Sequence, residues 1–109
     1  MEFIVTTGYD IPNAKITKIL GIARGSTVRT RNAVADTFAF VKKLIGGEVS
    51  EYTKLIADAR EQAIQRMIEE AKKYGANAII GVRFATANVM QGTAEILAYG
   101  TAVYVEKID

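Results

Sequence analysis

The clearest hydrophobic pattern in the chain is an apolar stripe between Ser50 and Tyr74 that recurs every three or four positions. Its members are Tyr52, Ile56, Ala59, Ala63, Met67, Ala71 and Tyr74. This spacing predicts one long amphipathic α-helix. The alanines keep the middle of the stripe thin, so we expect a β-sheet to approach the helix axis closely. Gly75 follows the last turn, where a left-handed C-terminal cap is expected.

The segments on either side of this helix have the composition of β-strands. The expected strands are Glu2–Thr7, Lys15–Arg31, Ile79–Ala87 and Thr93–Lys107. Turn-forming residues separate them: a turn is expected over residues 8–13 and a hairpin loop over residues 88–92. The long second strand contains Gly21 and Gly25, and we expect a bend or bulge at one of them.

A second, shorter helix is predicted between the long strand and the long helix. Its apolar positions at helical spacing are Val34, Phe38, Val41 and Ile45. Asn32 is the expected N-cap, and Gly46 and Gly47 end the helix. No internal repeat, low-complexity tract or linker interrupts the chain, which is short enough for one core, so residues 1–109 form a single expected domain.

Two of the strands are apolar on both faces. In Glu95–Val105 both the even-numbered and the odd-numbered positions are largely hydrophobic, and Ile16–Ile22 behaves similarly. A sheet with one solvated face alternates more cleanly. Two helices can cover one face, so another copy of the chain is the simplest cover for the other. The alternative is that bulges shift the parity of the strand positions.

Composition limits the chemistry that the chain can perform. Its 109 residues include no cysteine and no histidine, and its net charge is +2. Thiolate and imidazole ligands for soft heavy metals are therefore missing, and only oxygen donors suited to Mg, Ca or Mn remain. No nucleotide-binding or nucleophile motif occurs. We therefore expect no catalytic residues, no metal site and no cofactor, and the absence of a signal sequence or a membrane-length apolar run favours the cytoplasm.

Four polar residues within or beside the most distinctive segments are the candidate ligand-binding residues. They are Asp36, Tyr52, Arg60 and Glu61. Each also has a structural interpretation: Asp36 in the first turn of a helix, Tyr52 in the core with a solvated hydroxyl, and Arg60 paired with a neighbouring carboxylate.

Two further polar residues and one basic segment require partners. Asn77 is expected to bond backbone groups in the loop after the long helix. Arg83 must reach water or a carboxylate such as Glu95. The acid-free basic segment within residues 15–31 lacks the aromatic pattern of an RNA-binding sheet, so we expect no nucleic-acid partner and no membrane partner.

Several segments together resemble the YbjQ-like family of small bacterial and archaeal proteins. They are VTT (5–7), LGIARG (20–25), LIGGE (44–48), AREQA (59–63), GANAIIGVRF (75–84) and GTAVYVE (100–106). The resemblance spans nearly the whole chain. Glu48 and Ala35 stand where the family commonly has basic residues, so a family site built from those basic groups is not expected to be complete here.

The resemblance implies a fold, an assembly and a function class. The implied fold is α+β: an antiparallel sheet with two helices, one of them long, packed on one face, like a dodecin subunit. The implied assembly is a homopentameric ring, and the family carries a heavy-metal-binding label. From the residues and the resemblance together, the expected protein is a non-enzymatic homo-oligomer that binds a small ligand or hard cation. The alternative is a small enzyme with a carboxylate and arginine site at the subunit interface.

Overall fold

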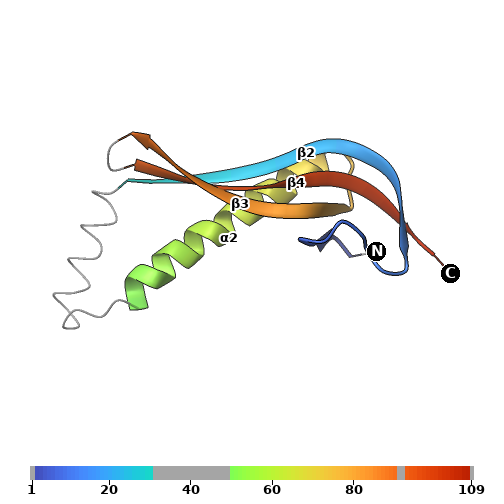
Figure 1. The fold of residues 1–109 in the computed structure, drawn as a ribbon, viewed down its shortest axis with the longest axis horizontal. Coiled ribbons are helices and arrows are strands. Elements are labelled where there is room, and N and C mark those ends of the chain that lie inside the picture. The colour runs from blue at the N-terminus through green and yellow to red at the C-terminus, as the bar shows by residue number, and fades with distance from the viewer. Residues whose placement is uncertain (1, 31–49, 91–92, 109) are drawn as a thin grey trace.

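The computed structural model describes residues 2–30, 50–90 and 93–108 of the chain. These residues form one α-helix and a four-stranded sheet, with α2 lying along one face of the sheet (Figure 1). The elements are β1 (Ile4–Val5), β2 (Ala14–Thr30), α2 (Ser50–Lys73), β3 (Ala78–Met90) and β4 (Thr93–Lys107). The α+β class is therefore confirmed. The second helix expected over residues 32–45 lies outside the described residues.

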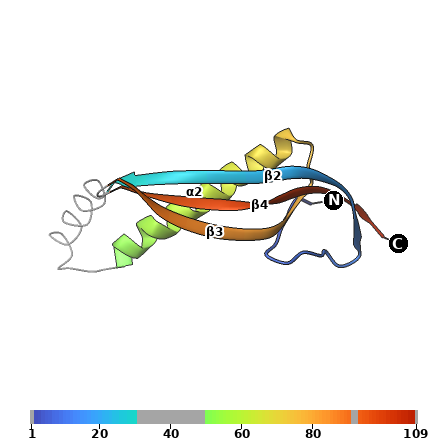
Figure 2. The same ribbon diagram turned by 45° about the horizontal axis from the view of Figure 1, so that its top comes forward.

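The sheet is mixed, so the expectation of an antiparallel sheet is wrong at β1. The strand order is β1-β3-β4-β2, in which β4 is antiparallel to both of its neighbours and β1 is parallel to β3. Figure 2 shows β2, β4 and β3 side by side, with β2 at one edge. Because β1 and β2 lie at opposite edges, the chain between them crosses the sheet. An apolar–polar pattern carries no information about strand direction, which depends on this connection.

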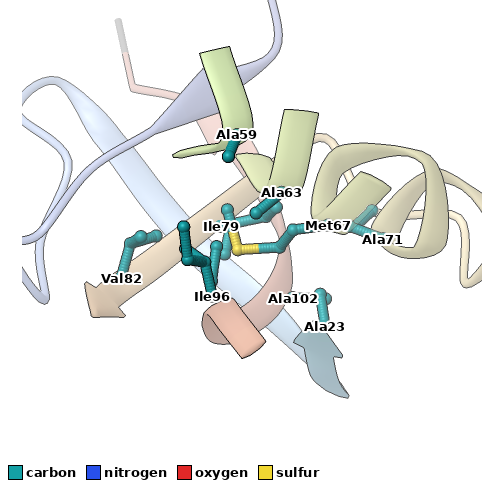
Figure 3. Packing of buried hydrophobic residues seen from close by; sticks show 11 residues of the cluster. Ala23, Ala59, Ala63, Met67, Ala71, Ile79, Val82, Ile96 and Ala102 are labelled. Carbon is teal, nitrogen blue, oxygen red and sulfur yellow. The ribbon is translucent and has the colours of Figure 1, made fainter. Parts of the chain in front are cut away.

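The alanine stripe lets α2 lie directly on β2, as the sequence predicts. Ala59, Ala63 and Met67 are fully buried, and Figure 3 shows Met67 extending from the helix toward sheet residues of the same cluster. A side chain at Gly25 would collide with the helix backbone at Ala63 and Met67. The hydroxyl of Thr27 donates a hydrogen bond of 2.9 Å to the carbonyl oxygen of Ala59.

The end of α2 is closed by the glycine cap that the sequence predicts. Gly75 has a φ of 83°. Its N–H donates to the carbonyl of Lys72 at 3.0 Å, and the N–H of Ala76 donates to the carbonyl of Ala71 at 3.1 Å. These two bonds define a Schellman motif, and the accompanying apolar contact is supplied by Ala71 and Ala76, which lie in the same buried cluster.

Strand β2 contains two bulges that shift the parity of its residues. The register against β4 slips between Ile16 and Lys18 and again between Ile19 and Gly21. Ile16, Ile19 and Ile22 pair with Val105, Val103 and Thr101 respectively. The three isoleucines, each three residues apart, therefore share the sheet face opposite α2. The sequence alternative, that bulges mislead a parity argument, is correct for this segment, whereas β4 remains apolar on both faces.

The N-terminal segment covers one end of the sheet face opposite α2. Ile11 packs with Ala78, Ile80, Val103 and Val105 in a second buried cluster. Ile11 begins a turn that leads into β2. The N–H of Ala14 donates to the carbonyl of Ile11 across this turn, and Asn13 has a φ of 62°. The sequence analysis expected another copy of the chain to cover this face of the sheet. The N-terminal segment of the same chain covers part of it.

Candidate functional site

Several exposed apolar side chains lie on the sheet face opposite α2, beyond the part of that face that Ile11 covers. Ile19 is 75% exposed, Ile22 is 64% exposed and Val28 is 52% exposed. The register places Tyr99 of β4 on the same face, because it pairs with Arg24 between Ile22 and Ser26. We name Ile19, Ile22, Val28 and Tyr99 the open sheet face. These exposed apolar side chains share one face, with Arg24 and Ser26 between Ile22 and Val28, and they make this face a candidate interaction site.

A polar cluster around Arg83 holds the N-terminal segment against β3. One guanidinium nitrogen of Arg83 donates to the carbonyl of Thr7 at 2.9 Å, and another donates to the hydroxyl of Tyr9 at 3.0 Å. The guanidinium also lies 5.5 Å from the centre of the Tyr9 ring. Gly81 makes room for that ring, because a Cβ there would lie 2.8 Å from it. Arg83 is exposed, so of the two expectations it reaches water, and its hydrogen-bond partners are carbonyl and hydroxyl oxygens and not the carboxylate of Glu95.

A second polar cluster lies where the last turns of α2 pass the edge of β2. A carboxylate oxygen of Glu70 accepts hydrogen bonds from the backbone N–H of Arg24, at 3.3 Å, and from the hydroxyl of Tyr74, at 3.2 Å. The guanidinium of Arg66 donates to the carbonyl of Ser26 at 2.6 Å. Partial desolvation, and then the hydrogen bond and charge of Glu70, raise the pKa of Tyr74.

Asn77 bonds a neighbouring strand and not the loop in which it stands. Its side chain accepts a hydrogen bond from the N–H of Val105 and donates one to the carbonyl of Val105, both at 2.8 Å. The expectation that Asn77 bonds backbone groups is confirmed, although those groups belong to β4. The pair of bonds locks the turn after α2 to the sheet.

The four candidate ligand-binding residues are only partly placed. Asp36 lies outside the described residues, and for Tyr52 the structure gives only its position in the first turn of α2. Arg60 and Glu61 are adjacent and exposed on α2. The carboxylate of Glu61 accepts a hydrogen bond of 3.5 Å from the side-chain amide of Gln65.

The donor set of the chain does not fit a soft heavy metal. Thiolate and imidazole are absent from the whole sequence. Within residues 2–30, 50–90 and 93–108, no three Asp or Glu side chains gather closely enough to hold an ion. A site of three or more carboxylates built from this part of the chain would therefore need more than one copy. In the same described residues, no helix is both long enough and apolar enough to cross a membrane.

Sequence reasoning missed the partners of Arg66 and Glu70. It assigned neither residue a partner. Both residues lie beside the apolar stripe and are four residues apart. This spacing indicates that they share one side of the helix, but it does not show which strand that side contacts. The hydrogen bonds to β2 depend on the close approach of the helix at Gly25, a contact between segments about forty residues apart.

Comparison with known proteins assigns the family. The fold is an α+β subunit with one long helix on a mixed sheet. The chain belongs to the YbjQ family, whose model carries the description "Putative heavy-metal-binding" and matches residues 3–106. It is 50% identical to a UPF0145 protein of Thermus thermophilus over 97% of this chain and 93% of that protein. It is 53% identical to a UPF0145 protein of Pyrococcus furiosus over the same shares.

A solved structure supports the fold independently of sequence. A protein of unknown function from Pediococcus pentosaceus, which belongs to the DUF74 family, aligns with a TM-score of 0.62. The alignment covers 94% of this chain and 96% of that chain at 13% sequence identity. At this identity the likeness bears on the arrangement of helix and strands alone.

Proposed function

We propose that this protein is a non-enzymatic homo-oligomer, a ring of five copies, that binds a small ligand or a hard cation between its subunits. The observation that carries the proposal is the open sheet face, on which Ile19 and Ile22 are 75% and 64% exposed. Full burial of one such side chain contributes about 1.5–3 kcal/mol. A second copy of the chain is the simplest partner for this face, and the number five rests on the family resemblance alone.

The proposed binding residues suit a site that assembly completes. Arg60 and Glu61 are consecutive exposed residues of α2, so a single chain leaves a ligand at either residue open to water. Exclusion of water strengthens charged contacts. We therefore place the ligand at a junction of subunits, where Arg60 and Glu61 act with Asp36 and Tyr52. A cation at the same junction would be held by symmetry-related carboxylates and would keep part of its water.

The alternative is a small enzyme with a carboxylate and arginine site at the subunit interface. Consecutive residues of a helix do not face each other, so Arg60 and Glu61 of one chain could act on one substrate only together with groups of a neighbouring subunit. The two functions differ in the fate of the bound molecule. Release of a chemically changed molecule, detected by mass spectrometry, favours the enzyme, whereas release of the unchanged molecule favours the binding protein.

Substitution of the open sheet face tests the proposal. Ile19→Glu combined with Ile22→Glu places charge where the face would be buried, and we expect this variant to fall to the subunit mass of 11.9 kDa in light scattering. Ile108→Glu is the control, because Ile108 is 54% exposed at the C-terminal end, where its backbone N–H donates to the carbonyl of Asn13. The proposal is wrong if the double variant keeps the mass of the unmodified protein.

A further inference from the structure

The middle of the β2 edge is occupied by side chains of α2. In the described part of the chain β2 has β4 as its strand neighbour on one side, and its other side is an edge of the sheet. Arg24 and Ser26 are two residues apart on an antiparallel strand, so their backbone groups that do not bond β4 point out of the same edge. Glu70 accepts from the N–H of Arg24, and Arg66 donates to the carbonyl of Ser26.

The geometry of α2 makes these two bonds mutually supporting. Arg66, Glu70 and Tyr74 are spaced by four residues, so they form one row along the helix. Tyr74 donates its hydroxyl to the same carboxylate oxygen that accepts from Arg24, which fixes the position of that carboxylate. Gly25, between the two bonded residues, brings the helix backbone close enough for the row to reach over the edge of the strand.

An open edge at this position would readily pair with another strand. The flanking residues Ile22 and Val28 are β-branched, apolar and 64% and 52% exposed. Exposed edges with such residues template the addition of further strands, and proteins protect them with charged side chains. An incoming strand at Arg24–Ser26 would have to displace both a carboxylate and a guanidinium from bonded positions.

We propose that Glu70 and Arg66 close the β2 edge at Arg24–Ser26 and thereby prevent another strand from pairing there. Copies of the chain then associate through the open sheet face and not by open-ended extension of the sheet across this edge. The consequence for assembly rests on the proposed homo-oligomer. The closure of the edge itself does not, because it is a property of each chain.

Hydrogen exchange of single amides, followed by NMR, tests the closure directly. We expect the amide of Arg24 to exchange about tenfold faster in Glu70→Ala than in the unmodified protein. Glu70→Gln keeps an oxygen acceptor and should exchange within a few-fold of the unmodified protein. Glu69→Ala is the control on the exposed side of α2, and the amide of Ala23, directed toward β4 by strand alternation, should not change. Unchanged exchange at Arg24 in Glu70→Ala overturns the proposal.

A second measurement tests the consequence for assembly. Light scattering of the double variant Arg66→Ala with Glu70→Ala should show larger, polydisperse assemblies with the infrared band of intermolecular β-sheet. Arg66→Lys with Glu70→Gln, which keeps a donor and an acceptor, should match the unmodified protein. If the double variant keeps the mass distribution of the unmodified protein, Arg66 and Glu70 do not prevent strand pairing at the β2 edge. If the unmodified protein is a monomer, the proposed homo-oligomer is refuted but the closure of the edge is not. The closure is still tested by whether the double variant is larger than the unmodified protein.

Discussion

Gly25→Ala is the substitution that most directly tests how α2 lies on the sheet. The added Cβ would contact the helix backbone at Ala63 and Met67 and would lie 2.7 Å from the carbonyl carbon of Arg66. A helix backbone cannot rotate away as a flexible side chain can. We therefore expect α2 to move off β2, which separates the fully buried Ala63 and Met67 from their sheet contacts.

The expected loss of stability combines two terms. Overpacking of a close-packed core costs about 1–3 kcal/mol. Displacement of α2 also strains the buried hydrogen bond from Thr27 to the carbonyl of Ala59, which is worth roughly 0.5–1.5 kcal/mol. Together they give about 3 kcal/mol, a large part of the roughly 5–15 kcal/mol that holds a domain folded. In a chain of this length that corresponds to a fall in melting temperature of roughly 10–20 °C.

Thermal unfolding followed by circular dichroism at one fixed protein concentration measures this loss. Gly8→Ala is the matched control, because a Cβ at Gly8 would meet the nearest atom, the hydroxyl oxygen of Thr6, at an ordinary 3.6 Å. The control should melt within about 6 °C of the unmodified protein, since compatible Gly-to-Ala changes alter stability by no more than about 1 kcal/mol. If Gly25→Ala melts with the control, the helix does not lie against β2 as described.

Three further outcomes are expected. Gly75→Val should lower stability by about 1–2 kcal/mol, because a β-branched residue disfavours the positive φ of the cap, although a Cβ there would meet no atom within 4 Å. An unchanged melting temperature would show that the cap is not left-handed. Asn77→Ala should lower the free energy of unfolding by about 2 kcal/mol, because both hydrogen bonds to Val105 are lost. Asn77→Asp keeps the acceptor and should lower it less; equal decreases in the two variants would show that the accepting bond does not contribute. Calorimetric titration with zinc and cadmium should give no dissociation constant below about 1 μM. Tighter binding would contradict this expectation, and symmetry-related carboxylates would be the first candidate ligands, because the chain has no cysteine or histidine.

The regular elements could be predicted because local patterns determine them. The 3.6-residue period placed α2 at Ser50–Lys73, and Gly75 marked its end. The strand Thr93–Lys107 was predicted with the bounds that the structure gives. Each of these features depends on residues close together in the sequence, and the close approach of α2 followed from the small side chains of its stripe.

The parts that sequence could not predict depend on contacts between distant segments. The bulges in β2 put Ile16, Ile19 and Ile22 on one face, where simple alternation would separate Ile19 from the other two. The direction of β1 depends on a connection that crosses the sheet. Arg83 was correctly judged to need a partner, but its hydroxyl and carbonyl partners come from the N-terminal segment, more than seventy residues earlier in the chain.

Native mass spectrometry of the protein purified without added metal tests the central claim most directly, because it reports subunit number and retained ligand together. The account predicts a single assembly of five copies of the 11.9 kDa chain, with any bound small molecule or ion visible as added mass. The same spectrum for Ile19→Glu with Ile22→Glu should show the single chain. A stable single chain of 11.9 kDa from the unmodified protein at micromolar concentration would contradict the claim that the open sheet face joins copies of this protein.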